Sequence, residues 1–396
     1  MFIGGFFRVA TGAGVAQLLS FLAIPVIARL YEVDTVGQYN ALFSYSMLGG
    51  VFLTFGFNRI VSNAVCVEEA DWARKIYLKI WLWLLPFTLL FSMVDEYVFV
   101  CVLLSMFAGL VVVYESFLLR VKKFGSQSGV HITFSVINNF LKCSLSAGLS
   151  SVPGAGLSVA TVISYFVKAI LLISISGGFK SDFSGSIANY RNVFFYRFPQ
   201  AVLAGIGAYF PVLSVYYIYG DHEAGLVGMS LGLLGVPVLL VGNAAFGILQ
   251  TKYAESTISE SFDSYLKSTV SLMVASFFGV FLFVGFGEVF LVLLLGDKWA
   301  GSYDFSVYII SWYAVMLISK PSYAAVSIVS KDRLSFWNEL LFFVFKVFVF
   351  VFALFLDFDA HYYVGFISLI SAFSYIVFSC LVYLEMKRFS RSKGGI

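Results

Sequence analysis

Four lysines lie inside long apolar stretches of this sequence, where charged side chains are rare. They are Lys142, Lys168, Lys320 and Lys346. A charge at the centre of a bilayer costs about 2.5–3.5 kcal/mol on insertion scales, so such residues usually face a protein interior or a watery cavity. Ammonium groups form charge-assisted hydrogen bonds with phosphate oxygens. The four lysines therefore predict a site for an anionic substrate such as a diphosphate. The alternative for each is snorkelling to the headgroups or pairing with a neighbour.

Polar residues accompany Lys142 at helical spacing. They are Ser135, Asn138, Asn139 and Ser146. Because residues three and four apart share one face of a helix, Asn138 and Asn139 join the predicted substrate site. Lys320 is followed directly by Pro321. A proline inside a helix removes one backbone hydrogen bond and clashes with the preceding turn, so we expect an interrupted helix there.

Among the acidic residues, Glu115 alone is identified as clearly within a membrane span. The interior is therefore expected to be net positive, without carboxylates to match its lysines. Glu115 is a candidate ion-coupling group. Its alternative role is structural, as the partner of Arg8 or Arg120.

The composition places the chain in a membrane. Of 396 residues, 60% are apolar and 12% charged, against about half and a quarter in soluble proteins. The mean hydropathy is +0.92. The apolar runs are apolar on every face, which favours helices over the alternating pattern of a barrel. A net charge of +3 is too small to indicate nucleic acid as a partner.

The apolar runs predict about twelve transmembrane helices, with eleven as the alternative. The predicted spans are residues 6–28, 38–58, 77–93, 97–119, 130–151, 154–175, 198–219, 224–247, 268–294, 304–329, 335–356 and 362–384. Each is about as long as a bilayer core requires. The fold class is therefore all-α and integral to the membrane, in a multi-pass arrangement.

Lysine and arginine concentrate in alternate connections between these spans. Such residues mark the cytoplasmic side, so both termini are predicted to be cytoplasmic. Arg29 breaks the pattern, because it closes the first span at the outer side. We expect it either to contact substrate or to pair with Glu32 or Asp34.

A faint internal repeat suggests two halves. The string IPVI at residues 24–27 matches FPVL at 210–213, and each is followed by a glycine-containing segment at similar spacing. Both strings end a span that starts on the same side, which predicts parallel repeats about an axis along the membrane normal. The predicted domains are six-helix lobes over residues 1–185 and 186–396, related by a pseudo-two-fold axis.

Signatures of catalysis and of bound cofactors are missing from the sequence. The four cysteines are scattered, and His131, His222 and His361 are isolated near span ends. No metal-binding pair and no ATP-binding motif is found. No large loop carries the general base that membrane catalysis would require. The chain is therefore predicted not to be an enzyme, with no catalytic residues, no metal and no cofactor.

Three segments carry a resemblance to a known family. They are GVAQLLSFLAIPVIARLY at residues 14–31 with DTVGQY at 34–39, YRFPQ at 196–200, and GDKWAG at 296–301. The chain resembles bacterial polysaccharide biosynthesis proteins of the O-antigen flippase type, in the multidrug/oligosaccharidyl-lipid/polysaccharide exporter superfamily. One departure is the string FNRI at residues 57–60, where that family has Arg-Tyr-Glu, which leaves any role of Arg59 open.

The resemblance implies a function and a location. It implies alternating access that moves an undecaprenyl-diphosphate-linked oligosaccharide, an O-antigen or related repeat unit, to the periplasmic leaflet of a bacterial inner membrane. Membrane lipid and other polysaccharide-assembly membrane proteins are the further expected partners. One alternative is a drug or small-cation exporter of the same superfamily, which would need buried carboxylates. Another is a membrane polysaccharide polymerase or ligase, which would need a large periplasmic loop.

Overall fold

The computed structural model describes residues 2–91, 95–146, 154–178, 183, 190–255, 258–326, 332–356 and 358–393. In these ranges the regular secondary structure is helical and no strand occurs. The chain divides into two compact units, Met1–Tyr216 (unit 1) and Tyr217–Ile396 (unit 2). The predicted lobe boundary between residues 185 and 186 lies outside the described residues, so it stays a prediction.

Unit 1 contains the helices of the first half of the chain. They are α1 (Phe2–Leu30), α2 (Val33–Leu53), α3 (Phe57–Asn63), α4 (Val67–Phe91), α5 (Glu96–Arg120), α6 (Phe124–Ser144), α7 (Ala155–Ser176), the π-helix η2 (Val193–Arg197) and most of α8 (Phe198–Tyr219). Unit 2 contains the rest. They are α9 (Asp221–Glu255), α10 (Ile258–Leu295), the 3-10 helix η3 (Asp297–Trp299), α11 (Ser302–Ile318), α12 (Lys320–Ala325), α13 (Asp332–Leu356) and α14 (Ala360–Lys393).

The predicted all-helical membrane fold is confirmed. Without the short α3 and α12, the described residues form twelve α-helices, one for each predicted span. Eight described helices are long and apolar enough to cross a membrane, or nine if the bent pair α2 and α3 is one span. The remaining three, α4, α6 and α11, are more polar or shorter. Twelve crossings and the cytoplasmic termini therefore stay predictions.

One predicted span ends earlier than expected. Within the span predicted over residues 38–58, helix α2 ends at Leu53. The next helix, α3, is bent by 57° relative to α2. The physical reason lies in the backbone, because Phe55 and Gly56 have φ angles of 47° and 75°. These left-handed conformations cannot continue a right-handed helix.

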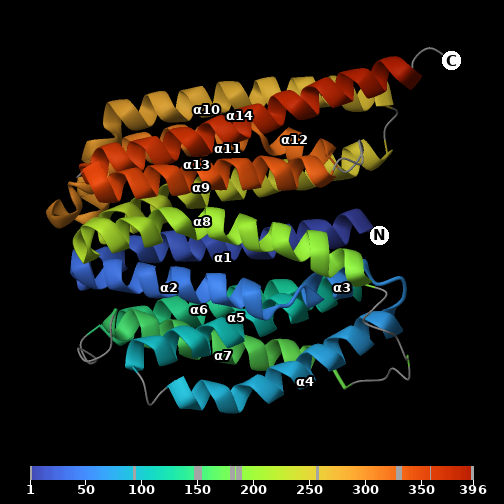
Figure 1. Cartoon of the computed structure of the whole chain (residues 1–396), viewed down its shortest axis with the longest axis horizontal. Coiled ribbons are helices and arrows are strands. Elements are labelled where there is room, and N and C mark those ends of the chain that lie inside the picture. Colours follow the sequence, from blue (N-terminus) through green and yellow to red (C-terminus); the bar gives the residue numbers. More distant parts are fainter. Residues whose placement is uncertain are drawn as a thin grey trace. The chain divides into compact units, whose positions relative to one another are not determined.

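In unit 1, α6 packs against α1 and α7, while α5 packs against α2 and α7 (Figure 1). Glycines allow two of these approaches. A Cβ atom on Gly156 of α7 would lie 2.2 Å from the carbonyl oxygen of Leu145, directly after α6. A Cβ atom on Gly50 of α2 would lie 2.8 Å from the Ala108 side chain of α5. The helices can therefore approach to backbone contact, as small residues permit in membrane proteins.

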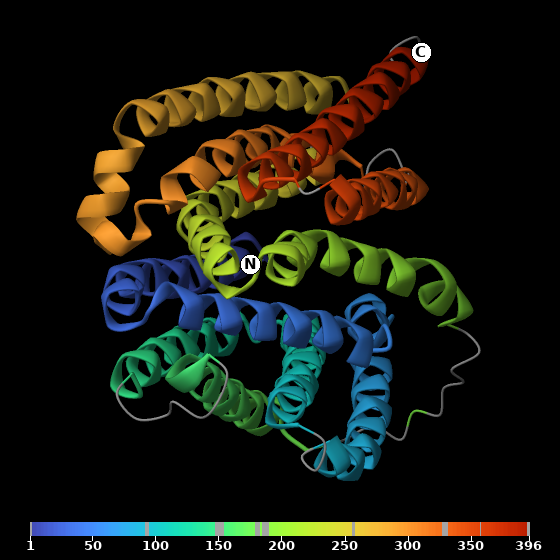
Figure 2. The same ribbon diagram turned by 60° about the vertical axis from the view of Figure 1, so that its left-hand side comes forward.

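In unit 2, α11 packs against α9, α10 and α14. The helices α10 and α14 have 38 and 34 residues, and they extend well beyond α11 with its 17 (Figures 1 and 2). A core of aromatic and apolar side chains, including Tyr253, Tyr265 and Phe378, is buried near the break between α11 and α12. This core fixes the helices that carry the C-terminal candidate residues.

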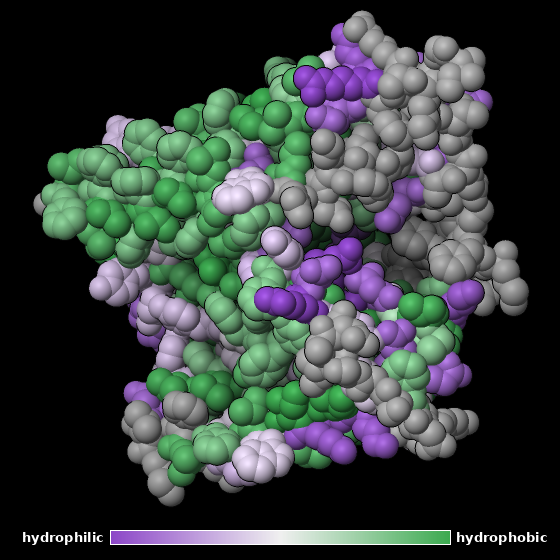
Figure 3. All heavy atoms as spheres, turned by 45° about the vertical axis from the view of Figure 1, so that its right-hand side comes forward, coloured by the Kyte–Doolittle hydropathy of each residue, from purple (hydrophilic) through white to green (hydrophobic). Residues whose placement is uncertain are grey.

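The surface has the character expected of a chain in lipid. Apolar residues cover much of the face shown in Figure 3, and hydrophilic residues gather in patches. On α10, Phe281, Val289 and Leu293 are 75%, 72% and 75% exposed. Exposed apolar side chains of this extent are typical of a surface that contacts lipid or another protein.

Candidate substrate-binding and ion-coupling residues

Lys168 and Glu115 form an ion pair inside unit 1. Lys168 Nζ on α7 lies 2.8 Å from Glu115 Oε1 on α5, and the side chains are 8% and 20% exposed. The ammonium group also lies 4.6 Å from the centre of the Phe134 ring. His131 Nε2 lies 3.7 Å from the same carboxylate oxygen. Lys168 therefore follows the alternative of pairing with a neighbour. The expectation that His131 is isolated is wrong, because α5, α6 and α7 pack against one another.

Glu115 has a different partner from those expected. Arg120 Nε donates a hydrogen bond to the carbonyl oxygen of Ala64 at 2.9 Å, and its Nη2 donates to that of Val65 at 2.6 Å. Arg120 therefore binds the carboxyl end of α3 instead of Glu115. The side chain of Arg8 lies outside the described part of the chain.

Lys142 is held by a chain of hydroxyl groups. Its Nζ atom donates to the Tyr39 hydroxyl at 2.7 Å. The Thr161 hydroxyl donates to the Leu157 carbonyl, so Tyr39 acts as the donor in the 3.1 Å contact with Thr161. No carboxylate among the described residues lies within ion-pair distance of Lys142. The Lys142 side chain thus lies at the junction of α2, α6 and α7 with hydroxyl groups as its neighbours.

Two residues of the polar stripe on α6 contact the neighbouring helix α1. Ser135 donates to the Ala16 carbonyl of α1 at 2.7 Å, and Asn139 Nδ2 lies 3.4 Å from Ser20 Oγ. These contacts join α6 to α1. Asn138 is partly buried, and its Oδ1 atom has no hydrogen-bond partner among the described residues. Asn139 therefore contributes to the packing of α6 against α1, and whether Asn138 binds substrate stays a prediction.

In unit 2, Lys346 and Glu339 lie on the same helix, α13. Lys346 is 7% exposed, and its Nζ atom lies 5.7 Å from the centre of the Trp312 ring of α11. Glu339 lies two helical turns earlier and is an electrostatic neighbour of Lys346. Sequence reasoning missed Glu339 as an in-span carboxylate, although its separation of seven residues from Lys346 places both on one helix face.

Lys320 lies at the predicted break. The helix is interrupted at Ser319, and Pro321 occupies the first turn of α12, which confirms the expected interruption. The aliphatic part of Lys320 lies against Gly242 of α9, where a Cβ atom would come within 2.8 Å of its Cε atom. No carboxylate in the described part of the chain lies within ion-pair distance of Lys320. Arg29 is exposed at the end of α1, and its role stays a prediction.

His361 is also less isolated than the sequence indicated. Its Nδ1 atom lies 2.8 Å from Asp359 Oδ1, and its Nε2 atom lies 3.9 Å from Asp304 Oδ2 on α11. The ring stacks on Phe305 at a centroid distance of 4.4 Å. These contacts fasten the start of α14 to the start of α11.

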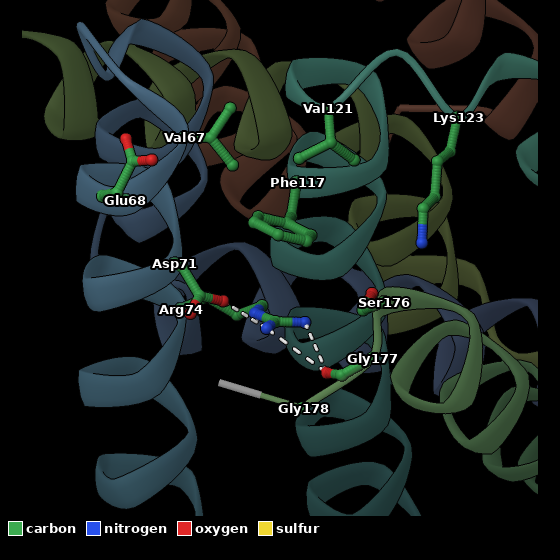
Figure 4. A pocket seen from close by; sticks show the side chains of 10 residues that line it. All are labelled: Val67, Glu68, Asp71, Arg74, Phe117, Val121, Lys123, Ser176, Gly177 and Gly178. Carbon is green, nitrogen blue, oxygen red and sulfur yellow. Dashed lines mark hydrogen bonds and ion pairs between the residues drawn. The ribbon is translucent and has the colours of Figure 1, made fainter. Parts of the chain in front are cut away.

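A cavity of about 340 Å³ lies where α4, α5 and α7 meet (Figure 4). The buried Arg74 side chain crosses it, forms an ion pair with Asp71 and donates hydrogen bonds to the Gly177 carbonyl oxygen. Its guanidinium carbon lies 4.1 Å from the centre of the Phe117 ring. Lys123 Nζ donates to the Ile175 carbonyl at 2.7 Å. Both cations thus cap the carbonyl end of α7, so we assign them a structural role.

No protein-family model and no curated protein matches the sequence of this chain. Among solved structures, it is similar to the inward-facing conformation of a multidrug resistance MATE family transporter of the MOP superfamily, with a TM-score of 0.71 and 15% identity. The match covers 95% of this chain and 96% of that one. The chain has the fold of a MATE transporter.

Two further solved structures are similar to this chain. The outward-facing conformation of a multidrug resistance MATE family transporter has a TM-score of 0.66 and 14% identity, covering 98% and 96% of the two chains. A MOP superfamily transporter from Pyrococcus furiosus has a TM-score of 0.63 and 15% identity, covering 97% and 95%. The MATE fold agrees with the superfamily implied by the sequence resemblance, but it does not distinguish the O-antigen flippase type from the multidrug type.

Proposed function

We propose that the chain is a membrane transporter that works by alternating access. The support is a MATE fold over nearly the whole chain, seen in inward-facing and outward-facing conformations in the structures it resembles. Such a transporter exposes its substrate site first to one side of the membrane and then to the other.

For the substrate, we propose an anionic, lipid-linked oligosaccharide joined to its lipid through a diphosphate. The observation that supports this substrate is the excess of lysines over paired carboxylates within the membrane spans. Lys142 and Lys320 have no carboxylate in ion-pair contact among the described residues. Uncompensated ammonium groups at membrane depth are costly, and phosphate oxygens would offset that cost.

The polarity of a pocket matters within this fold. In the MOP superfamily transporter from Pyrococcus furiosus, the reverse polarity of the binding pocket suggests a different function for that protein. In unit 1 we propose that Lys142 contacts the diphosphate, with Arg29 and Asn138 as further contacts. Lys168 and Asn139 support them through their contacts within unit 1. In unit 2 we propose Lys320 and Lys346 as contacts for anionic groups of the substrate.

A second candidate is an exporter of cationic drugs. It is favoured by the multidrug transporters among the similar structures and by the presence of Glu339, a carboxylate near the aromatic residues Tyr323 and Tyr375. Cations bind to carboxylates and to aromatic faces. The two candidates predict opposite preferences for the charge of the ligand.

Binding measurements with undecaprenyl diphosphate separate these candidates. The full chain in nanodiscs should bind this lipid, and Lys142→Gln and Lys320→Gln should each weaken binding about tenfold, the value of one charge-assisted hydrogen bond. Lys79→Gln is the matched control, because Lys79 is exposed on α4. Unchanged binding in both site variants would contradict the anionic substrate. Preferential binding of ethidium, lost in Glu339→Gln, would establish the second candidate.

A further inference from the structure

The turn that leads into α8 exposes two large aromatic side chains. The Phe198 N–H donates a hydrogen bond to the Val193 carbonyl, five residues back, so residues 193–197 form the π-helix η2. Such wide turns are rare and are frequent at functional sites. Within it, Phe195 and Tyr196 are 64% and 56% exposed. Both belong to the first turn of the apolar stretch Val193–Tyr219, so they lie at the end of a membrane span.

The other side of this turn is fastened to the rest of unit 1. The Phe194 ring meets the Phe57 ring of α3 edge-on, with 6.4 Å between the ring centres. Just before η2, the Tyr190 hydroxyl donates a hydrogen bond to the Glu69 carboxylate of α4. The packing of this inner side against α3 and α4 therefore determines which side chains of the turn face outward.

Arginines accompany the exposed rings. Arg191 precedes η2 and Arg197 ends it, and both are exposed. The Arg191 guanidinium carbon lies 5.3 Å from the centre of the Phe195 ring. Arg59 is exposed on α3, the helix against which η2 packs. The sequence of α3 and of residues 190–219 contains no aspartate or glutamate. The outward side of the turn is therefore both cationic and aromatic.

This combination fits an anionic phospholipid at the edge of the bilayer. Guanidinium groups bind phosphate oxygens through paired hydrogen bonds. Aromatic side chains are stable at the level of the headgroups, where one part of the ring contacts acyl chains. Basic residues close to an anionic membrane surface each add to the attraction. A soluble anion would meet the charges but would leave the exposed rings uncovered.

We propose that the surface formed by Arg191, Phe195, Tyr196 and Arg197 (the elbow surface) binds the headgroup of an anionic phospholipid. The lipid belongs to the leaflet at this end of α8, which the distribution of basic residues predicts to be cytoplasmic. The guanidinium groups contact the phosphate, and the rings lie between headgroups and acyl chains. Arg59 adds positive charge from α3. This inference goes beyond the proposed function, because it requires no transported substrate.

Native mass spectrometry of the full chain in detergent measures the binding, with phosphatidylglycerol as the anionic probe and phosphatidylcholine as the uncharged one. Arg191→Gln and Arg197→Gln should each weaken phosphatidylglycerol binding about fivefold, the effect of one basic residue near an anionic surface. Arg388→Gln is the matched control, because Arg388 is 77% exposed on α14 but pairs with Glu385. Its binding should equal that of the wild type.

Three results of that titration would overturn the proposal. The first is equal affinity of the wild type for the two lipids. The second is unchanged phosphatidylglycerol binding in Arg191→Gln and Arg197→Gln. The third is an equal loss in Arg388→Gln, which would indicate attraction by positive charge in general.

Fluorescence quenching in vesicles locates the lipid. The Phe195→Trp variant adds a fluorophore to the elbow surface, and the emission of the six native tryptophans is subtracted using the wild type. Brominated phosphatidylglycerol should quench the added emission more than brominated phosphatidylcholine at the same mole fraction, and high salt should reduce this preference. Adding Arg191→Gln and Arg197→Gln should abolish it. Equal quenching by both lipids in Phe195→Trp, or loss of the preference on adding inorganic phosphate at constant ionic strength, would overturn the proposal.

The same assay separates the elbow surface from the proposed substrate site. Phe195→Trp combined with Lys142→Gln should keep the preference for phosphatidylglycerol, because Lys142 belongs to the substrate site. A preference lost in this variant would overturn an independent lipid surface. If the chain binds no undecaprenyl diphosphate while the preference holds, the proposed substrate fails and the elbow surface stands.

Discussion

Lys168 Nζ lies 2.8 Å from Glu115 Oε1, so α7 and α5 are joined by an ion pair at membrane depth. Glu115→Gln leaves the Lys168 charge nearly buried and unpaired. We expect this variant to lose about 3 kcal/mol of unfolding free energy. The measurement is denaturant unfolding of the purified chain in detergent.

The double variant Glu115→Gln with Lys168→Met provides the control. Removing both charges should restore much of the lost stability, because no unpaired charge remains. If the double variant loses as much unfolding free energy as the two single variants together, the two side chains do not interact.

The approach of α6 to α7 depends on Gly156. A Cβ atom there would lie 2.2 Å from the Leu145 carbonyl oxygen, and backbone cannot move aside as a side chain does. Gly156→Ala should therefore destabilise unit 1 by about 3 kcal/mol, the upper end for overpacking. Gly129→Ala on α6 is the matched control, because nothing lies within 4 Å of its Cβ position.

Gly129→Ala should leave stability unchanged or raise it by up to about 1 kcal/mol through the lower entropy of the unfolded chain. Thermal unfolding in the same detergent measures both variants. Equal melting temperatures for Gly156→Ala and Gly129→Ala would refute the close approach.

Gly242 sets the position of Lys320. A Cβ atom at Gly242 would lie 2.8 Å from Lys320 Cε, so Gly242→Ala should push the flexible lysine aside at a stability cost of only about 1 kcal/mol. Undecaprenyl diphosphate binding should weaken nearly as much as in Lys320→Gln.

Gly232→Ala on the same helix has open space at its Cβ position and should bind like the wild type. If Gly242→Ala and Gly232→Ala bind equally well, the position of Lys320 does not determine binding.

Asp359 should give a small pH dependence of stability. The backbone N–H and the ring of His361 both contact its carboxylate at 2.8 Å and lower the pKa of Asp359 below its ordinary 3.8. The contribution is therefore present above pH 3.8 and is lost as the pH falls through the lower folded-state value. Because the Asp359 side chain is 60% exposed, we expect well under about 1 kcal/mol.

Unfolding of Asp359→Asn and the wild type from pH 6 down to pH 3 measures this difference. It should be constant near neutral pH and shrink in acid. A difference that grows in acid would have the wrong sign for this interaction.

The helices were predictable from the sequence because each apolar run is long enough to cross a bilayer and must satisfy its own backbone hydrogen bonds. The break at Ser319 was predictable from Pro321, whereas the end of α2 at Leu53 depends on the left-handed backbone at Gly56.

The pairing of Lys168 with Glu115 was not predictable. It joins residues on different helices, and only the packing of α5 against α7 brings them together. Glu339 could have been found from its spacing to Lys346, but the absence of a donor for its Oε2 atom among the described residues depends on the neighbouring helices.

The most direct test of the proposed function uses a strain that lacks this chain. The amount of surface glycan and the amount of undecaprenyl-diphosphate oligosaccharide in that strain are measured together. We predict complete lipid-linked repeat units trapped on the cytoplasmic leaflet and none at the surface. Normal glycan export, with new sensitivity to toxic cations, would contradict the lipid-linked substrate and support the drug exporter.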